Sequence, residues 1–205
     1  MSERQNNSEA ITRLLVLRHG QSEWNAEGRW QGQADVKLTD QGITQAKLAA
    51  TKLGRFDLIA TSTLQRARHT AEIIAGHLDH DHLHVDERLN ESNIGPWQGL
   101  TYAEIEAGWP GYLNSRRQPE GFEPNSSVVG RMIEAFIEIA DKCRGGQALV
   151  ISHSGVIRTL RRELRVDDIR LENLGGSWFE IDSKDTVRAG RLVAVIGELN
   201  SAESL

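Results

Sequence analysis

The sequence RLLVLRHG at residues 13–20 joins a short apolar run to an arginine, a histidine and a glycine. The run Arg13–Leu17 is almost uninterrupted by polar residues, which is typical of a β-strand that is buried on both faces. Such strands belong to parallel sheets covered by helices on both sides. In these sheets ligands bind beyond the carboxyl ends of the strands. We therefore expect Arg18 and His19 to lie at a ligand-binding edge.

The rest of the chain alternates strand-like and helix-like segments. Short apolar runs predict further strands at residues 57–61, 84–85, 148–152, 177–181 and 191–196. Helices are predicted between them, one capped by Thr39 and another starting near Gly155. The helix faces are marked by Ile43, Ala46, Ala50 and Leu53; by Ala67, Ala71, Ile74 and Leu78; and by Val129, Met132, Phe136 and Ile139. This order predicts an α/β fold, a three-layer sandwich with a mostly parallel central sheet flanked by helices.

The length and the distribution of polar residues predict one domain. We expect it to span residues 13–199, after a mobile N-terminal tail at residues 1–12. The stretch 89–125 is irregular and holds all four prolines, so we interpret it as an insertion that carries function. A long helix should follow, with Ser126 or Ser127 as its N-cap.

Composition narrows the class of protein. The net charge of −5 argues against a general nucleic-acid binder, because binding to a phosphate backbone normally needs a basic face. The single cysteine, Cys143, excludes an internal disulfide and a cysteine-based zinc cluster. The polar first residues predict no signal peptide, and no apolar run approaches membrane-spanning length. We expect a cytoplasmic protein with no membrane partner.

Histidine and arginine residues recur at the ends of the predicted parallel strands. Arg18-His19-Gly20 follows the first strand, and Ser62 with Arg66 one turn later follows the second. His153-Ser154-Gly155 follows the strand at 148–152. Because the carboxyl ends of parallel strands share one edge of a sheet, these side chains should converge.

This set of residues suits a phosphate group. Two arginines can bind a phosphate dianion through paired hydrogen bonds, and a neutral imidazole can accept a phosphoryl group. Gly20 leaves room for the backbone to approach the phosphate, and His153 could donate a hydrogen bond to the transferring group. The arginines and His153 supply the electrostatics, so we expect neither a metal nor a cofactor.

Several motifs resemble the histidine phosphatase superfamily, the phosphoglycerate mutase-like clan. They occur in the family's order from residue 14 to about residue 160. The matching segments are Leu17-Arg18-His19-Gly20-Gln21-Ser22 with Asn25; Gln31-Gly32; Leu38-Thr39 with Gly42; Ser62-Thr63-Leu64-Gln65-Arg66-Ala67 with Thr70-Ala71; Leu89-Asn90-Glu91 with Gly95, Trp97 and Gly99; and Ser152-His153-Ser154-Gly155-Val156-Ile157-Arg158.

The resemblance implies a role for each matching residue. His19 would be the residue that is phosphorylated, and Glu91 would be the general acid and then the general base. Arg18, Arg66 and His153 would form the catalytic phosphate pocket. Assisting phosphate-binding roles fall to Asn25, Ser22, Gln31 and Ser154. The implied activity is that of a metal-independent phosphomonoester phosphatase that acts on a small phosphorylated metabolite.

The clan contains mutases as well as phosphatases. The segment after Glu91, Ser92–Gly99, is similar to that of the small phosphatase branch, and the chain is shorter than typical mutases. Against this, Arg116-Arg117 lie where mutases hold a substrate carboxylate, which leaves open a phosphoglycerate or a glycosylated phosphoglycerate as substrate. The Gly-Gly-Glu-Ser-like element of the family is altered at Gly121–Ser126, so local substrate contacts stay open. Relatives are commonly dimers, and a homodimer stays open too.

Other classes of protein fit less well. A cofactor-dependent phosphoglycerate mutase and a non-catalytic binder of phosphorylated ligands remain as alternatives. A serine hydrolase would need glycine two residues before its nucleophile, where this chain has Ser152 ahead of Ser154. The histidines and aspartates of residues 77–84 could bind a metal, but we interpret them as a solvated loop.

Overall fold

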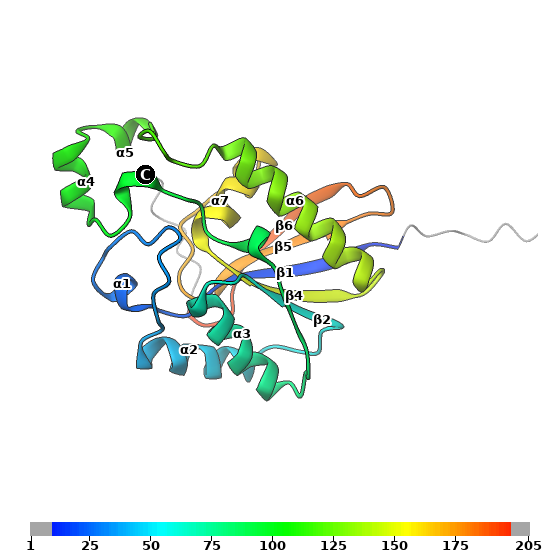
Figure 1. Ribbon diagram of the computed structural model, residues 1–205. Helices are drawn as coiled ribbons and strands as arrows, with labels where there is room; N and C mark the ends of the chain where they lie inside the picture. The colour runs from blue at the N-terminus through cyan, green and yellow to red at the C-terminus, as the bar shows by residue number, and fades with distance from the viewer. Residues whose placement is uncertain (1–9, 198–205) are drawn as a thin grey trace, which may run out of the picture.

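A computed structural model describes residues 10–197 as a six-stranded sheet with helices on both faces (Figure 1). The strand order is β3-β2-β4-β1-β5-β6. The strands are β1 (Thr12–Arg18), β2 (Leu58–Thr61), β3 (Leu83–Val85), β4 (Gln147–Ser152), β5 (Gly175–Ile181) and β6 (Val187–Ala194). Strands β3, β2, β4 and β1 pair in parallel, whereas β5 and β6 are antiparallel additions. The predicted α/β sandwich with a mostly parallel sheet is confirmed.

Alternate residues of β1 pack into two separate cores. Leu14 and Val16 face the core beneath α6 (Asn125–Lys142) and α7 (Ser154–Glu163). Leu15 and Leu17 face the core beneath α2 (Asp40–Ala50) and α3 (Gln65–His77). Figure 1 shows these helix pairs on opposite sides of the sheet. The central strand is therefore apolar along its length because both of its faces are covered.

The starts of two helices differ in how they are stabilised. Thr39 caps α2 as predicted, since its Oγ1 accepts a hydrogen bond from the Gly42 N–H at 3.0 Å. The prediction that Ser126 or Ser127 caps α6 is wrong, because this helix begins at Asn125 after Pro124. Ser127 lies inside the first turn and its hydroxyl donates to Glu123 Oε1 at 3.1 Å.

The ends of the predicted elements shift at both termini of the domain. Strand β1 begins at Thr12, within the segment predicted as tail, because Thr12 pairs with Ile181 and its Oγ1 accepts from the Gly145 N–H. Residues 1–9 of that predicted tail, and residues 198–199 of the predicted domain, lie outside the described part of the chain. Strand β6 covers Val187–Ala194 rather than residues 191–196, since it follows the antiparallel register of β5.

The insertion at residues 89–125 has structure of its own. It contains the 3₁₀ helix η2 (Gly95–Trp97) and the helices α4 (Tyr102–Gly108) and α5 (Tyr112–Ser115), and it follows the 3₁₀ helix η1 (Glu87–Leu89). Its centre is a small apolar cluster around the buried Trp97, packed against Trp30 beside the short helix α1 (Glu23–Ala26). The insertion therefore has a core of its own at one end of the sheet (Figure 1).

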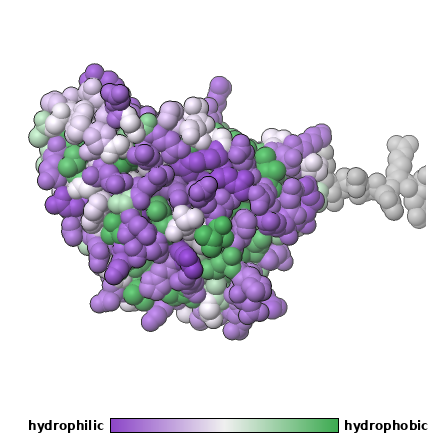
Figure 2. Space-filling model, viewed as in Figure 1, coloured by the Kyte–Doolittle hydropathy of each residue, from purple (hydrophilic) through white to green (hydrophobic). Residues whose placement is uncertain are grey.

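The surface shown in Figure 2 is predominantly hydrophilic, with smaller hydrophobic areas between the polar ones. Within residues 10–197 no helix is both long and apolar enough to span a bilayer. Over the same residues, no group of three or more His, Cys, Asp or Glu side chains is arranged to hold a metal ion.

Candidate active site

The carboxyl ends of β1, β2 and β4 bring the predicted catalytic residues together. These strands are neighbours in the sheet and run in parallel. The Arg66 Nε atom lies 3.2 Å from His19 Nε2, and the rings of His19 and His153 are 5.2 Å apart. Both histidines and Arg66 are buried. The convergence expected from the strand ends is therefore present in the structure.

His19 is held with its Nε2 atom unprotonated. Its Nδ1 atom lies 2.6 Å from the Gly20 carbonyl oxygen, which can only accept a hydrogen bond, so Nδ1 carries the proton. Burial, followed by the charges of Arg66 and Arg18, holds the pKa of His19 well below its ordinary value. Nε2 consequently carries a lone pair at neutral pH, as a nucleophile requires, and this lone pair accepts the hydrogen bond from Arg66 Nε.

Gly20 is required for a different reason from the one that the sequence suggested. A Cβ atom at this position would lie 2.6 Å from the Gly42 carbonyl oxygen at the start of α2. The Gly20 N–H donates to Thr70 Oγ1 at 3.1 Å. Glycine thus lets the loop after β1 pack against α2 and α3, which fixes the position of the neighbouring His19.

Arg66 is oriented by two backbone carbonyls. Its Nη1 and Nη2 atoms donate to Ala34 at 2.6 Å and to Gly32 at 2.8 Å. Burial lowers the pKa of Arg66 to about 10, with the carboxylates of Glu91 and Asp35 opposing this effect. The guanidinium remains positive at neutral pH and is fixed beside His19 before any substrate arrives.

Arg18 supplies a second buried positive charge. Its Nη1 atom donates to the Leu171 carbonyl oxygen at 2.7 Å. Burial lowers the pKa of Arg18 to about 10, and the nearby Glu172 opposes the shift. Arg18 and Arg66 together make the pocket cationic at neutral pH, which suits a phosphate dianion.

His153 has one buried nitrogen without a partner. Its Nε2 atom lies 2.8 Å from Ser62 Oγ, while its Nδ1 atom has no hydrogen-bond partner among residues 10–197. Ser62 Oγ also accepts from the Leu64 N–H at 3.3 Å, and we assign its hydroxyl proton to the bond with Nε2 because this leaves the unpartnered Nδ1 atom as a donor for an anionic ligand. The Nδ1 atom then carries a proton, and a phosphoryl oxygen is the kind of acceptor that would satisfy it.

Glu91 lies at the N-terminus of α7. Its Oε2 atom accepts from the Gly155 N–H at 3.0 Å, and Oε1 accepts from Val156 at 3.1 Å and from Ser92 at 2.9 Å. A Cβ atom on Gly155 would lie 2.5 Å from Glu91 Oε1, so glycine is needed for this approach. Glu91 also contributes electrostatically to both Arg18 and Arg66, which places it beside the cationic pocket.

Three of the four assisting residues predicted from the family motifs, Ser22, Asn25 and Gln31, form a local network around α1. Ser22 Oγ accepts from the Asn25 N–H at 3.3 Å and donates to Gln31 Oε1 at 2.8 Å. Ser22 is fully buried and caps α1, so its hydroxyl holds the loop in place. Ser154 is the first residue of α7, directly after His153.

One residue of the site was not predicted from the sequence. Asn173 Nδ2 donates to the His19 carbonyl oxygen at 2.9 Å and lies 3.4 Å from Asn25 Oδ1. The loop that carries it also supplies the Leu171 carbonyl for Arg18. No sequence pattern marked this residue, since it lies in a polar loop after the family-like motifs.

Arg116 and Arg117 lie outside the contacts just described. Arg117 Nε donates to Ser115 Oγ at 3.0 Å, and its guanidinium stacks on the Tyr112 ring at 4.3 Å. Arg116 ends α5 and contributes electrostatically to Arg158 on α7. The pair therefore diverges: Arg117 packs on its own segment, and Arg116 lies nearer to α7.

The Ser62–His153 contact gives a testable prediction. In Ser62→Ala we expect kcat to fall by roughly 10-fold, because a misoriented hydrogen-bond donor loses much of its effect on the transition state. Ser62→Thr retains the hydroxyl and should retain most of the activity. Nitrogen NMR of the His153 ring should show a proton on Nδ1 in the parent and a mixed tautomer in Ser62→Ala. An unchanged tautomer in Ser62→Ala would contradict the assignment.

Comparison with known proteins agrees with this geometry. A sequence profile of the histidine phosphatase superfamily (branch 1) matches residues 14–187. Glucosyl-3-phosphoglycerate phosphatase of Mycobacterium tuberculosis is 37% identical over 167 residues, covering 74% of each chain. The 2,3-bisphosphoglycerate-dependent phosphoglycerate mutase of Nitrobacter winogradskyi is 37% identical over 163 residues, covering 72% of this chain and 79% of the mutase.

A solved structure shares the whole fold. The native structure of a mycobacterial glucosyl-3-phosphoglycerate phosphatase superposes with a TM-score of 0.76 at 30% identity, covering 90% of this chain and 98% of the other. The profile match spans β1 through the start of β6 and includes every strand end that forms the site. The chain belongs to the histidine phosphatase superfamily.

Proposed function

We propose that this chain hydrolyses phosphomonoesters through a phosphohistidine formed on His19. The observation that carries the proposal is the unprotonated Nε2 atom of a buried histidine, held 3.2 Å from the Arg66 guanidinium. A phosphoryl group bound to His19 Nε2 would replace the hydrogen bond from Arg66 Nε, and its oxygens would then face the Arg66 guanidinium. Its oxygens would also accept from Arg18 and from the unpartnered His153 Nδ1.

The reaction has two steps. In the first, His19 Nε2 attacks phosphorus, the ester P–O bond breaks, and Glu91 in its protonated form gives its proton to the leaving oxygen. In the second, the Glu91 carboxylate takes a proton from water, whose oxygen attacks phosphorus and displaces His19. The hydrogen bonds of Glu91 to the α7 backbone and its electrostatic contribution to Arg18 and Arg66 support this role.

The electrostatic requirements of both steps are met by side chains. Arg18 and Arg66 would neutralise charge on the phosphoryl oxygens, and we propose assisting roles for Asn25, Gln31 and Ser154. This supports a metal-independent reaction. Because the substrate would be a small phosphorylated metabolite, we also propose a cytoplasmic location.

The substrate would carry a second anionic group. Support comes from Arg116, which lies near the half-buried Arg158 of α7, and from a relative named for glucosyl-3-phosphoglycerate. Burial lowers the pKa of Arg158, and the positive charges of Arg162, Arg116 and Arg170 lower it further while Asp168 opposes them. A carboxylate on the substrate would offset part of this repulsion.

A phosphoglycerate mutase is the second candidate function. The observation that favours it is the similarity to a mutase at 37% identity. In that reaction the phosphoryl group on His19 would return to a second hydroxyl of the substrate instead of passing to water.

Phosphate release from a panel of substrates tests the proposal. The panel contains an aryl phosphate, 3-phosphoglycerate, a sugar phosphate and a glycosylated phosphoglycerate, each with a metal chelator present. Mutase turnover is measured in parallel with 2,3-bisphosphoglycerate. Phosphate release that needs His19 supports the phosphatase, and interconversion of phosphoglycerates without release supports the mutase. Binding of the panel compounds with neither activity would make the chain a binding protein.

A further inference from the structure

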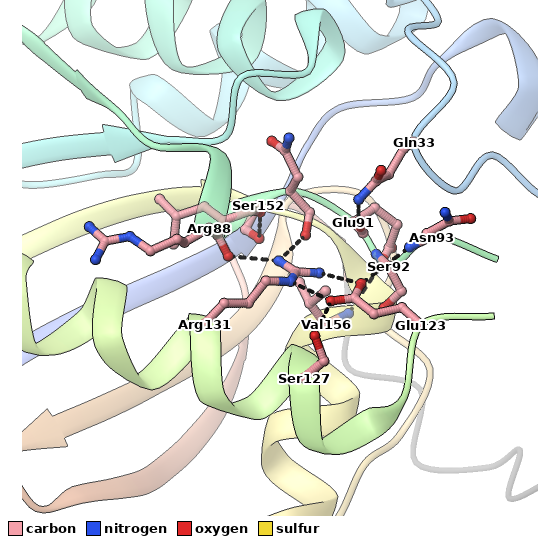
Figure 3. Close-up of polar contacts among 12 residues, drawn as sticks. Gln33, Arg88, Glu91, Ser92, Asn93, Glu123, Ser127, Arg131, Ser152 and Val156 are labelled. Carbon is pink, nitrogen blue, oxygen red and sulfur yellow. Dashed lines mark hydrogen bonds and ion pairs between the residues drawn. The ribbon is translucent and has the colours of Figure 1, made fainter. Parts of the chain in front are cut away.

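The segment that carries Glu91 is attached to the rest of the fold through its backbone (Figure 3). Ser152 Oγ donates to the Leu89 carbonyl oxygen at 2.8 Å. Gln33 Nε2 donates to the Glu91 carbonyl oxygen at 3.0 Å. Because Glu91 lies in a stretch without regular secondary structure, such contacts decide where its carboxyl group points.

Arg131 on α6 makes the shortest of these contacts. Its Nη1 atom donates to the carbonyl oxygens of Arg88 at 2.7 Å and of Asn90 at 2.6 Å. Figure 3 shows the side chain reaching from α6 to this segment. A single nitrogen therefore joins two carbonyls just before Glu91 and limits rotation of the peptide units between them.

Glu123 completes the attachment on the other side of Glu91. Arg131 donates to its carboxylate through Nε at 2.8 Å and Nη2 at 3.0 Å, and both side chains are less than one-fifth exposed. The Glu123 N–H donates to the Asn93 carbonyl at 2.8 Å, and Oε2 accepts from the Asn93 N–H at 3.2 Å. The ion pair thus holds the chain before and after Glu91.

Charge on this pair is maintained at neutral pH. Burial alone would raise the pKa of Glu123, but the hydrogen bonds and charge of Arg131, with hydrogen bonds from Ser127 and the Asn93 N–H, together hold the pKa below its ordinary value. A half-buried, doubly hydrogen-bonded pair of this kind is geometrically specific, because the planar guanidinium fits the carboxylate in one orientation.

We propose that Arg131 and Glu123 are positioning residues that set the geometry in which Glu91 exchanges its proton. This inference rests on the proposed function and deepens it. Both residues act through the backbone around Glu91. Their effect should therefore appear in the two steps in which Glu91 moves a proton, namely protonation of the leaving oxygen and deprotonation of the attacking water.

The leaving group separates this effect from a general structural one. An alkyl phosphate releases a weakly acidic alcohol, whose oxygen needs a proton as the P–O bond breaks. 4-Nitrophenyl phosphate releases a stable phenolate that can leave without one. The value of kcat/KM covers the steps up to phosphorylation of His19, which include protonation of the leaving oxygen. Because only the alkyl phosphate needs that proton, the ratio of kcat/KM between the two substrates reports on proton delivery by Glu91.

The experiment compares this ratio in Arg131→Met, Arg131→Lys, Glu123→Gln and Glu91→Gln with that of the parent. In Arg131→Met we expect kcat/KM for glycerol phosphate to fall by about 10- to 100-fold, as misplacement of a catalytic group can cost. For 4-nitrophenyl phosphate we expect a loss of no more than about 3-fold, because the proton matters little there. Glu91→Gln should show the same selectivity with a larger amplitude.

Arg131→Lys tests whether charge alone is sufficient. Arg131 is among the charges that lower the pKa of His153, after burial, Arg66 and His19. Lysine retains that charge but cannot bond the two carbonyls and the carboxylate together. We therefore expect Arg131→Lys to resemble Arg131→Met, and Glu123→Gln to have an intermediate effect.

Arg161→Met is the matched structural control. Arg161 is more deeply buried than Arg131 and donates to the carbonyls of Asp167 at 2.6 Å and Gly190 at 2.8 Å, away from the Glu91 segment. Its loss should lower the thermal midpoint and leave the substrate ratio unchanged.

The outcomes separate this inference from the proposed function. Equal losses with both substrates in the folded Arg131 and Glu123 variants would overturn the inference. Additive losses in the double variant Arg131→Met/Glu91→Gln would also overturn it, because residues that act as a unit are not additive. If Arg131→Met does not fold, the substrate ratios of Arg131→Lys and Glu123→Gln test the inference in its place. If the His19→Ala variant kept the activity of the parent protein, this result would instead contradict the proposed function.

Discussion

Replacing His19 with alanine should reduce the release of inorganic phosphate by on the order of 10⁴-fold or more, because the covalent step loses its nucleophile. His153 Nε2 does not substitute for His19 Nε2, because it is bonded to Ser62. Arg18, Arg66 and His153 remain in the variant. Substrate should therefore still bind, and equilibrium binding measured by calorimetry should change far less than turnover.

Controls for this variant come from the same protein. His69 on α3 is an exposed histidine, so His69→Ala should keep the parent's activity. Thermal unfolding of His19→Ala should remain cooperative, which excludes loss of the fold as the cause. Phosphate release that persists at the parent rate would rule out His19 as the acceptor. Trapping of the parent with labelled substrate should place the phosphoryl group on His19.

Replacing Arg66 with methionine should lower kcat/KM by roughly 100- to 1000-fold, as removal of one preorganised donor to transition-state charge does in other enzymes. Arg66 is 1% exposed and bonded to His19, Gly32 and Ala34, so its charge cannot be replaced by solvent. Arg66→Lys should recover little, because an ammonium cannot reproduce the planar array of donors.

The same variant should change the titration of His19. After burial, the charge of Arg66 is the next cause that lowers the pKa of His19. Removing that charge leaves burial in place, so the pKa should rise toward, but not reach, its ordinary value. NMR titration of the His19 ring measures this directly. Arg68→Met is the control, since Arg68 is exposed on the same helix and pairs with Glu72; a fall in the His19 pKa would contradict the assignment.

Much of the fold could be predicted because the local signals agree with the tertiary structure. The apolar runs at β1 and β4 have no alternation because both faces are covered, and Thr39 caps α2 through its own side chain. The start of α6 could not be predicted in this way. Pro124 occupies the N-cap position of that helix without a side-chain hydrogen bond, so the nearby serines were misleading.

Some residues of the candidate site could likewise be predicted from the sequence, and others could not. His19, Arg66 and His153 could be placed because each follows a strand, and parallel strands share an edge. Asn173 and Arg131 could not, since they act on backbone carbonyls of distant segments. Every residue has a backbone carbonyl, so a side chain that donates to a carbonyl does not depend on the identity of the residue that accepts. The residues around His19 and Glu91 therefore give no sequence signal for these contacts.

The contacts of the loop around Asn173 have a consequence for how the protein gains activity during synthesis. β1 is made early, yet its neighbours β4 and β5 lie far along the chain, and the bonds from Arg18 to Leu171 and from Asn173 to His19 span 153 and 154 residues. Pairings over such sequence distances form late, because loop closure must precede them. A growing chain on the ribosome therefore contains the nucleophile long before it contains the pocket. Catalytic activity should appear only when the last segments have joined the sheet, which makes turnover a reporter of complete folding.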